Sequence, residues 1–304
     1  MNFLVKGVAA AALGAAVAVP LLRKRYKIHP AVTIAALAAG PPALAVVKPR
    51  SRVRDAGMYA LQMWMFLIGH ELPYDDPDNL RSRLRVGYPI RADRVIGGGA
   101  LPNVRLQRAL AGLGRRNVID RFLSWVHWSW FIEPHAALAW ILARDPEHFA
   151  RSARQMSAVY DLGCVVYAAA PTAPPWWASR EGYTDENVRR IMEEVGEEEW
   201  GRLWPVLYDT LGGNPWAAMP SLHFATSLMA ALLLAEAGPV HATAGWAYAG
   251  ALGFALVYLG EHYVVDLLVG AAIVLAARRG ERYVEPLALA VSRGLQRLER
   301  IANQ

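Results

Sequence analysis

One stretch of the sequence ends in a histidine that follows a proline and a serine. It begins at Asn214 and closes on Pro220-Ser221-Leu222-His223, directly before an apolar run. Proline is well tolerated at the first position of a helix, where the missing N–H has no helical partner. We therefore expect Pro220 to open a helix whose first free amides lie beside Ser221 and His223. Free amides at the positive end of a helix dipole form a phosphate site.

A second histidine occurs further along the chain, in the stretch from Glu261 to Asp266. His262 and Asp266 are four residues apart, which places them on one face of a helix. At that spacing the carboxylate can hold the imidazole. Tyr263, inside the same stretch, is a further candidate for substrate contact.

Two histidines and an aspartate beside a phosphate site suit phosphoryl transfer through a phosphohistidine. Asp266 is expected to accept the Nδ1 proton of His262, which leaves Nε2 to attack phosphorus. His223 is then the acid that protonates the leaving oxygen and the base that deprotonates the incoming hydroxyl or water. Ser221 and the free amides behind Pro220 are expected to hold the equatorial phosphate oxygens, where charge must be stabilised.

Two other interpretations of these histidines stay open. Two imidazoles and one carboxylate also match the facial triad of a metal site. A metal site explains neither Pro220 nor Ser221, so we predict no metal and no cofactor. A histidine at the end of a membrane span is also commonly an interfacial residue, and we interpret His29, His148 and His241 in that way.

The composition indicates an integral membrane protein. The chain has 304 residues, of which 55% are hydrophobic and only 19% are charged, too apolar for an ordinary soluble domain. The net charge of +6 comes largely from arginines outside the apolar runs. Because those runs are long enough to cross a bilayer, we expect anionic lipid head groups as partners, and no nucleic acid. The single cysteine, Cys164, excludes a disulfide framework and a thiolate metal cluster.

The fold class that we predict is all-α: a polytopic membrane bundle with a six-span core and one or two extra N-terminal hydrophobic segments. The core covers residues 56–282, between an N-terminal part (1–55) and an amphipathic C-terminal tail (283–304). The apolar run 30–47 is interrupted by Gly40-Pro41-Pro42 and has basic clusters on both sides. Whether it crosses or turns back at the prolines stays open. The apolar runs expected in the core are 56–70, 122–143, 156–170, 221–237, 240–260 and 262–277.

Two connections inside the core are long. Segment 77–121 has ten arginines between 81 and 121, mixed with apolar residues that include Leu80, Val104 and Leu113. We interpret it as interfacial helices that contact lipid phosphates, with substrate recognition as the alternative. Segment 171–220 is expected to form an outer loop with a rigid turn at its prolines and an acidic helix from 184 to about 204.

Crossing counts place both histidines on the outer face. His223 begins one span and His262 begins the span two later, so one full hairpin separates them. The basic loop 144–154 and the arginines after the last span indicate the cytoplasmic side. We therefore expect a multi-pass protein of the cell membrane with its active site on the outer face.

Four ionisable residues lie within the predicted spans: His127, Glu133 and His135 in one span and Asp161 in the next. Ionisable groups are costly in lipid, so they indicate a polar cavity for a head group such as a polyol. Asp161 and His135 are the candidate ligands of that group. Structural pairing between neighbouring spans is an equal alternative.

At the histidine motifs the chain resembles a known family. Pro-Ser-Leu-His at 220–223 and His-Tyr-Val-Val-Asp at 262–266 resemble the second and third signatures of the type 2 phosphatidic acid phosphatase superfamily. They are most similar to its inositol phosphorylceramide synthase and sphingomyelin synthase branch, as is the proline-rich segment 167–177. The resemblance covers roughly residues 56–280. It implies a six-helix core, an outward-facing site and metal-independent transfer, with the histidines and the aspartate in the roles given above.

The chain also departs from that family's pattern. Phosphatase members have a Lys-x₆-Arg-Pro signature, and this chain has no Arg-Pro dipeptide. They also have Ser-Arg six residues before the last histidine, where this chain has Ala255-Leu256. Two expected phosphate ligands are therefore missing, and Arg180 and the arginines of segment 77–121 are candidates to replace them. The loss favours a head-group transferase.

The resulting hypothesis is a lipid phosphotransferase of the membrane bilayer. It takes a phosphate or phospho-head group, possibly of the phosphoinositol type, from a phospholipid or polyprenyl phosphate donor onto His262. It then passes that group to an alcohol or to water. One alternative is a lipid or polyprenyl phosphate phosphatase, and another is a non-catalytic lipid-binding membrane protein.

Overall fold

The computed structural model describes residues 2–110, 117–211 and 213–303, and the described residues are overwhelmingly helical. Isolated bridges are the only β-type pairing in this part of the chain. The predicted all-α class is thereby confirmed. The chain forms two compact units. We call them the terminal unit (Met1–Asp75, Leu138–Ser157 and Ala277–Gln304) and the central unit (Asp76–Ala137 and Ala158–Ala276). The predicted functional division into 1–55, 56–282 and 283–304 is a different partition and stays a prediction.

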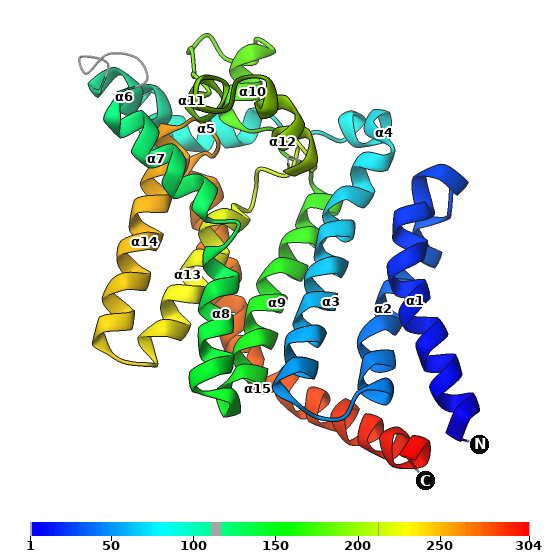
Figure 1. The fold of residues 1–304 in the computed structure, drawn as a ribbon. Coiled ribbons are helices and arrows are strands. Elements are labelled where there is room, and N and C mark those ends of the chain that lie inside the picture. Colours follow the sequence, from blue (N-terminus) through cyan, green and yellow to red (C-terminus); the bar gives the residue numbers. More distant parts are fainter. Residues whose placement is uncertain (1, 111–116, 212, 304) are drawn as a thin grey trace. The chain divides into compact units, whose positions relative to one another are not determined.

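The terminal unit contains a helical hairpin at the N-terminus (Figure 1). Its helices are α1 (Asn2–Tyr26) and α2 (Pro30–Val47), followed by α3 (Arg52–Glu71) and the short helix η1 (Leu72–Asp75). Helix α2 is continuous through its two internal prolines, so the run does not turn back there. At the end of α1 the buried Arg23 binds Glu71 at 2.6 Å and Asp75 at 2.9 Å, which joins α1 to the end of α3.

Three helices have the length and apolar composition needed to cross a membrane: Leu4–Tyr26, Pro30–Val47 and Pro239–Tyr258. A bilayer core is about 30 Å thick and needs roughly 20 helical residues. Leu222–Ala235, which is also apolar, has 14 residues. These findings support an integral membrane protein, and the predicted number of six core spans stays a prediction.

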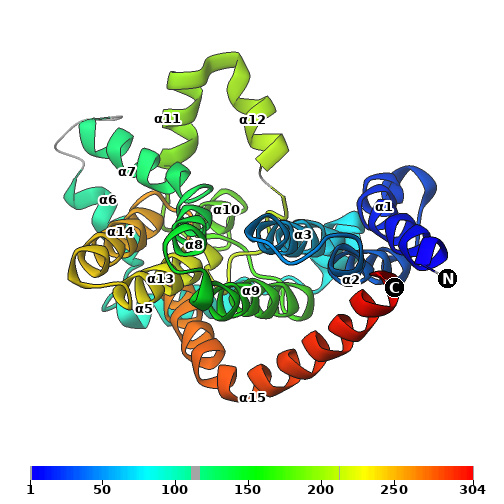
Figure 2. The ribbon, with the colours of Figure 1, turned by 60° about the horizontal axis from the view of Figure 1, so that its bottom comes forward.

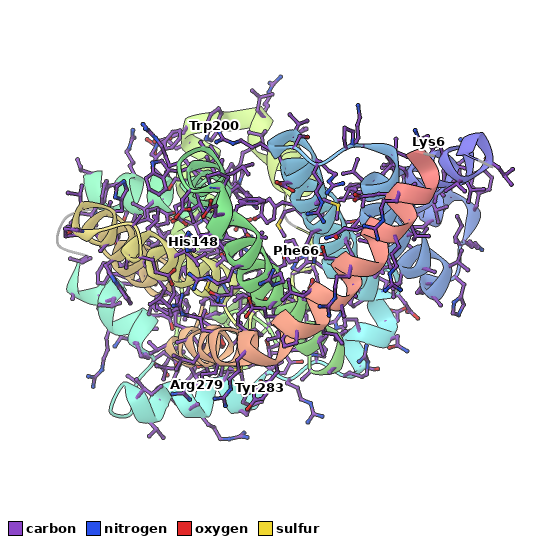
Figure 3. The ribbon with its side chains drawn as sticks, turned by 90° about the horizontal axis from the view of Figure 1, so that it is seen from below. Lys6, Phe66, His148, Trp200, Arg279 and Tyr283 are labelled. Carbon is purple, nitrogen blue, oxygen red and sulfur yellow. The ribbon has the colours of Figure 1, made fainter. Side chains whose placement is uncertain are left out.

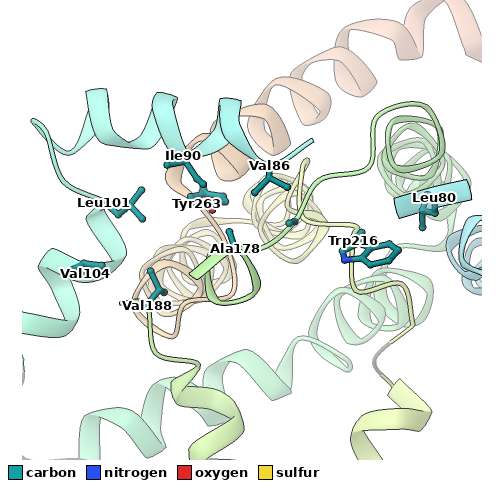
Figure 4. Packing of buried hydrophobic residues seen from close by; sticks show 10 residues of the cluster. Leu80, Val86, Ile90, Leu101, Val104, Ala178, Val188, Trp216 and Tyr263 are labelled. Carbon is teal, nitrogen blue, oxygen red and sulfur yellow. The ribbon is translucent and has the colours of Figure 1, made fainter. Parts of the chain in front are cut away.

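The central unit begins with three short helices of the arginine-rich segment. They are α4 (Pro77–Ser82), α5 (Gly87–Ile96) and α6 (Pro102–Ala109). Several apolar side chains of this segment face protein, while Val95 and Ile96 of α5 are exposed. Leu80 and Leu101 are fully buried, and they pack in one cluster with Val104 and with Tyr263 of the second histidine motif (Figure 4). The interfacial placement of this segment stays a prediction, and Leu113 lies outside the described residues.

The predicted span 122–143 is interrupted. It consists of α7 (Val118–Ser129) and α8 (Glu133–Arg144), separated by a turn at residues 130–132. Helix α7 starts with a capping box in which Asn117 accepts from the Asp120 amide and Asp120 accepts from the Asn117 amide. Helix α9 (Pro146–Ala169) follows.

The connection after α9 contains α10 (Pro175–Arg180), α11 (Ile191–Trp200), η3 (Gly201–Leu203) and α12 (Trp204–Leu211). Figure 2 shows α11 and α12 as a helical hairpin. The acidic helix expected from residue 184 begins only at Ile191. The reason is that the backbone there is bonded to other elements: Arg189 exchanges two hydrogen bonds with the Gln107 amide, and the Ile191 amide donates to the Leu259 carbonyl.

Three helices complete the chain: α13 (Leu222–Ala235), α14 (Pro239–Tyr258) and α15 (Val264–Asn303). Helices α13 and α14 pack against each other. Helix α15 is continuous from the second histidine motif into the predicted tail. Arg279 and Tyr283, one turn apart on it, lie side by side in Figure 3.

Candidate active site

The second histidine motif forms the connection between α14 and α15. The Nδ1 atom of His262 lies 3.2 Å from Oδ2 of Asp266, and the Tyr263 amide donates to the same oxygen at 2.9 Å. Helix α15 starts only at Val264, so His262 precedes the helix instead of sharing one of its faces. The contact forms because the chain turns at His262 and Asp266 lies in the first helical turn. Both residues are buried, His262 to 5% and Asp266 to 0% exposure.

The first histidine motif places His223 directly against His262. Nδ1 of His223 lies 3.3 Å from Nε2 of His262, and the two rings meet edge to face. Asp266, His262 and His223 therefore form one line of contacts, carboxylate to imidazole to imidazole. In such a line the aspartate defines the tautomer of the middle imidazole and leaves its far nitrogen directed at the second one.

The start of α13 differs from the expectation in one respect. Ser221 is the N-cap, because its Oγ accepts from the Phe224 amide at 3.3 Å. Pro220 therefore lies one residue before the cap, and not at the first helical position. Ser221 is completely buried. Its hydroxyl hydrogen is a separate donor that could bond to a phosphate oxygen, and this predicted role of Ser221 stays a prediction.

The two motifs are joined through their backbones. The Ser221 amide donates to the Asp266 carbonyl at 3.0 Å. The close approach requires a glycine on α15, because a Cβ at Gly270 would lie 2.8 Å from the Ser221 carbonyl oxygen. A backbone oxygen moves less easily than a side chain, so Gly270 determines how near the starts of the two helices come.

The proline-rich segment at the end of α9 is hydrogen-bonded to the residues that precede α13. Thr172 exchanges backbone hydrogen bonds with Trp216 and Ala218, and its Oγ1 accepts from the Met219 amide at 2.7 Å. The Tyr167 hydroxyl donates to the Pro220 carbonyl at 2.6 Å. Segments 167–172 and 216–220 are therefore hydrogen-bonded to each other, and this pairing orients His223.

His223 lies between two further aromatic rings. The His127 ring stacks on it at 4.9 Å between centroids, and the Trp130 ring lies 4.1 Å away. His127 is 5% exposed, and its Nδ1 atom has no hydrogen-bond partner among the residues that the structure describes. The sequence identified His127 only as one of four polar residues within spans. A histidine in an apolar run was the available signal, but its partner was not predictable.

Arg190 and Glu261 form a buried ion pair beside the second motif, and neither was predicted. Arg190 Nε donates to Glu261 Oε1 at 2.9 Å, and the guanidinium lies 3.8 Å from the centroid of the Trp176 ring. Burial by itself raises the pKa of a carboxyl. The Arg190 charge and its hydrogen bond nevertheless hold the pKa of Glu261 below its ordinary value. Arg190 and Glu261 also lie within electrostatic reach of His127.

The other predicted substrate ligands lie in varied surroundings. The Arg180 side chain is 58% exposed and binds Glu193 at 2.9 Å, and it lies over the same Trp176 ring. Tyr263 is fully buried in the cluster of Figure 4, and within the described part of the chain its hydroxyl has no hydrogen-bond partner. These roles stay predictions.

The polar residues of the predicted spans contact neighbouring helices. Glu133 accepts from the Ser227 hydroxyl at 3.1 Å, and the His135 ring stacks on Tyr160 at 6.3 Å between centroids. Asp161 instead lies near Cys164 of its own helix, α9, and the Asp161 charge acts on the Cys164 thiol. The contacts of Glu133 and His135 are of the kind that the structural alternative predicts, while the ligand roles of His135 and Asp161 stay predictions.

Comparison with known proteins bears on this site. A family model described as the PAP2 superfamily matches residues 103–279, more than half of the chain. A segment of 126 residues is 31% identical to inositol phosphorylceramide synthase of Candida albicans. The match covers 40% of this chain and 27% of that protein, so the chain spans about a quarter of its curated relative. No solved structure matches.

Proposed function

We propose, from the premise that the chain belongs to the PAP2 superfamily, that it is an integral-membrane lipid phosphotransferase that works through a phosphohistidine. The family resemblance predicted from the two motifs is confirmed by the family match and by the similarity to inositol phosphorylceramide synthase. The observation that carries the proposal is the line of contacts from Asp266 through His262 to His223, with spacings of 3.2 and 3.3 Å.

The line of contacts supplies both halves of a phosphoryl transfer. In the first half, Nε2 of His262 forms a bond to phosphorus while the bond from phosphorus to the donor oxygen breaks, and His223 gives its proton to the leaving oxygen. In the second half, the acceptor hydroxyl returns a proton to His223. Its oxygen bonds to phosphorus, and the nitrogen–phosphorus bond breaks. Asp266 stabilises the His262 ring in each half.

Substrate must separate the two histidines before reaction. Their facing nitrogens are 3.3 Å apart, which leaves no space for a phosphorus atom bonded to Nε2. His262 is held by Asp266 on one side and is buried. His223 is the less buried of the two, so we assign the movement to its ring.

A lipid whose head group contains inositol phosphate is the first donor to test. The Candida albicans relative is named for inositol phosphorylceramide, and the match with it covers 40% of this chain. We propose a lipid donor of that type, an alcohol acceptor, metal-independent turnover and a site on the outer face of the cell membrane.

The test separates transfer from hydrolysis. Purified protein in lipid vesicles receives phosphatidylinositol labelled in its phosphate, with ceramide, with a diacylglycerol whose acyl chains differ from those of the donor, or without an alcohol acceptor. We expect label in a new lipid only when an acceptor is present, and full activity in EDTA. Water-soluble label that ignores the acceptor supports the phosphatase alternative. An absence of turnover with this donor and with phosphatidic acid supports the lipid-binding alternative, and loss of activity in EDTA contradicts metal independence.

We further propose that Arg190 supplies one of the missing basic phosphate contacts. It is 7% exposed and is bound to Glu261, the residue next to His262. Its guanidinium has five donors in a planar fork, the geometry that matches phosphate oxygens. A phosphate at His262 therefore competes with Glu261 for the guanidinium, whereas the exposed Arg180 lies at the outer side of the Trp176 ring.

Replacing Arg190 is expected to weaken transfer more than replacing Arg180. Because Arg190→Gln alone leaves Glu261 buried without a partner, the informative variant is Arg190→Gln combined with Glu261→Gln. We expect kcat/KM for the labelled donor to fall by on the order of 10²–10³-fold, the scale of lost transition-state charge stabilisation. Arg180→Gln is the matched control, with a change within about fivefold because exposed ion pairs contribute little. The reverse order of effects assigns the phosphate contact to Arg180.

A further inference from the structure

The first amides of α15 are bonded to a carboxylate from a distant part of the chain. Oδ2 of Asp93 accepts from the Val264 amide at 2.8 Å, and Oδ1 accepts from the Val265 amide at 2.9 Å. Asp93 belongs to α5 and is completely buried. The first amides of a helix have no partner within it. Asp93 therefore does for α15 what a local N-cap residue does for most helices.

A second buried side chain of the same segment holds His262 itself. Nδ2 of Asn103, in α6, donates to the carbonyl of His262 at 2.9 Å and to the carbonyl of Val257 at 2.7 Å. Asn103 is also completely buried. One amide group thus joins the end of α14 to the residue that carries the nucleophile.

Together Asn103 and Asp93 bond to the backbone of the turn that carries the His262 ring. Asn103 binds the carbonyl of His262, Asp266 binds the amide of Tyr263, and Asp93 binds the amides of Val264 and Val265. Four backbone groups between the carbonyl of His262 and the amide of Val265 thus bond to three buried side chains. Asn103 acts on this turn through backbone hydrogen bonds, and Asp93 acts through backbone hydrogen bonds and through the effect of its charge on Asp266.

We propose that Asp93 and Asn103 are positioning residues for the reaction, and that the arginine-rich segment is the part of the fold that aims His262 at phosphorus. The inference rests on the proposed function. Its physical basis is that a reacting group must be held near its attack geometry, and a misplacement of about 1 Å can cost about 10²-fold in rate. A negative charge at the start of α15 is also favourable toward the helix dipole.

Helix α6 provides a matched control. Gln107 lies one turn after Asn103 and is likewise buried. It donates to the carbonyls of Arg189 and Tyr258 and accepts from the Arg189 amide. Gln107 thus makes the same kind of bonds, from the same helix, without touching the His262 turn. A role in stability alone predicts equal effects at Asn103 and Gln107.

The kinetic test compares Asn103→Leu, Asp93→Asn and Gln107→Leu in the full-length protein. The labelled-donor assay gives kcat and KM, and thermal unfolding gives stability. We expect Asn103→Leu to lower kcat by about 10–10²-fold with little change in KM. Asp93→Asn keeps one of two acceptor oxygens and should lose less. Gln107→Leu should lower the unfolding temperature while it leaves kcat within about threefold. Equal kcat losses for Asn103→Leu and Gln107→Leu overturn the proposal.

A second measurement does not depend on turnover. Histidine labelled with ¹⁵N reports the ring nitrogens of His262 by NMR in detergent micelles, with His262→Ala used to assign the signal. We expect Asn103→Leu and Asp93→Asn to shift or broaden this signal and Gln107→Leu to leave it in place. Should the wild type show no transfer, the shift still tests the positioning role, so failure of the proposed function and failure of this inference are distinguishable. An unmoved His262 signal in folded Asn103→Leu and Asp93→Asn contradicts the inference.

Discussion

Replacing His262 with alanine is expected to reduce transfer by at least about 10⁴-fold, because removal of an enzyme's nucleophile commonly lowers its rate by that factor or more. In the proposed mechanism His262 alone forms the covalent intermediate, since among the described residues Asp266 is buried behind it and His223 lies on the far side of its ring. The phosphoenzyme should disappear as well. Brief incubation with labelled donor, followed by an alkaline quench that preserves phosphohistidine, measures both effects.

The control for this prediction must separate chemistry from folding. His262→Ala removes a buried ring and leaves Asp266 without its imidazole, so thermal unfolding is measured for each variant. His262→Gln retains volume and an amide donor and should be equally inactive. His148→Ala should be fully active, because the His148 side chain is exposed on α9 and pairs only with Asp145 among the residues that the structure describes. Residual transfer above one per cent in either His262 variant sinks the phosphohistidine mechanism.

Replacing His223 with alanine is expected to lower transfer by roughly 10²–10⁴-fold, the usual contribution of a positioned acid or base. The loss should depend on the leaving group. An alkoxide needs a proton as it departs from phosphorus, whereas the anion of an acidic phenol does not. A p-nitrophenyl phosphate ester should therefore phosphorylate His223→Ala at a rate close to that of the wild type, whereas the lipid donor should phosphorylate it much more slowly.

The same variant should accumulate phosphohistidine. In the proposed mechanism His223 also takes the proton of the incoming hydroxyl, so its removal should slow the second half-reaction for any donor. With the activated ester we expect a burst of p-nitrophenol and labelled enzyme that decays slowly. His262→Ala should give no burst with the same ester. A loss in the rate of enzyme phosphorylation that is identical for lipid and phenyl donors excludes the role of His223 as the general acid.

Local patterns explain what was predictable about the fold. Long apolar runs predicted helices, and α1, α2 and α14 have the expected length and composition. Predictions based on a single run were less successful at their ends. Residues 130–132 break the run 122–143 into α7 and α8, and Arg189 and Ile191 are bonded to Gln107 and Leu259 instead of starting a helix early. Such ends depend on partners that lie elsewhere in the chain.

The site shows the same limit more sharply. The four-residue spacing of His262 and Asp266 predicted their contact, and the contact exists although His262 precedes the helix. The arginine-rich segment was expected to contact lipid, because arginines and leucines in a connection suit the membrane interface. That expectation stays a prediction, and it gave no sign that Asp93 and Asn103 of the same segment bond to the His262 turn. The buried pair of Arg190 and Glu261 was also not predictable, since their charges are far apart in the sequence.

The sequence by itself determined the helical class, the family, the two histidine motifs and the pairing of His262 with Asp266. Each of these depends on composition or on spacing within one turn of helix, where covalent geometry limits the distances. The tertiary structure alone decided that His223 faces His262 and that Ser221 bonds to the carbonyl of Asp266. It also decided that Asp93 caps α15 across 171 residues of chain. These contacts depend on how separate helices pack, and side-chain burial across the fold decides that packing.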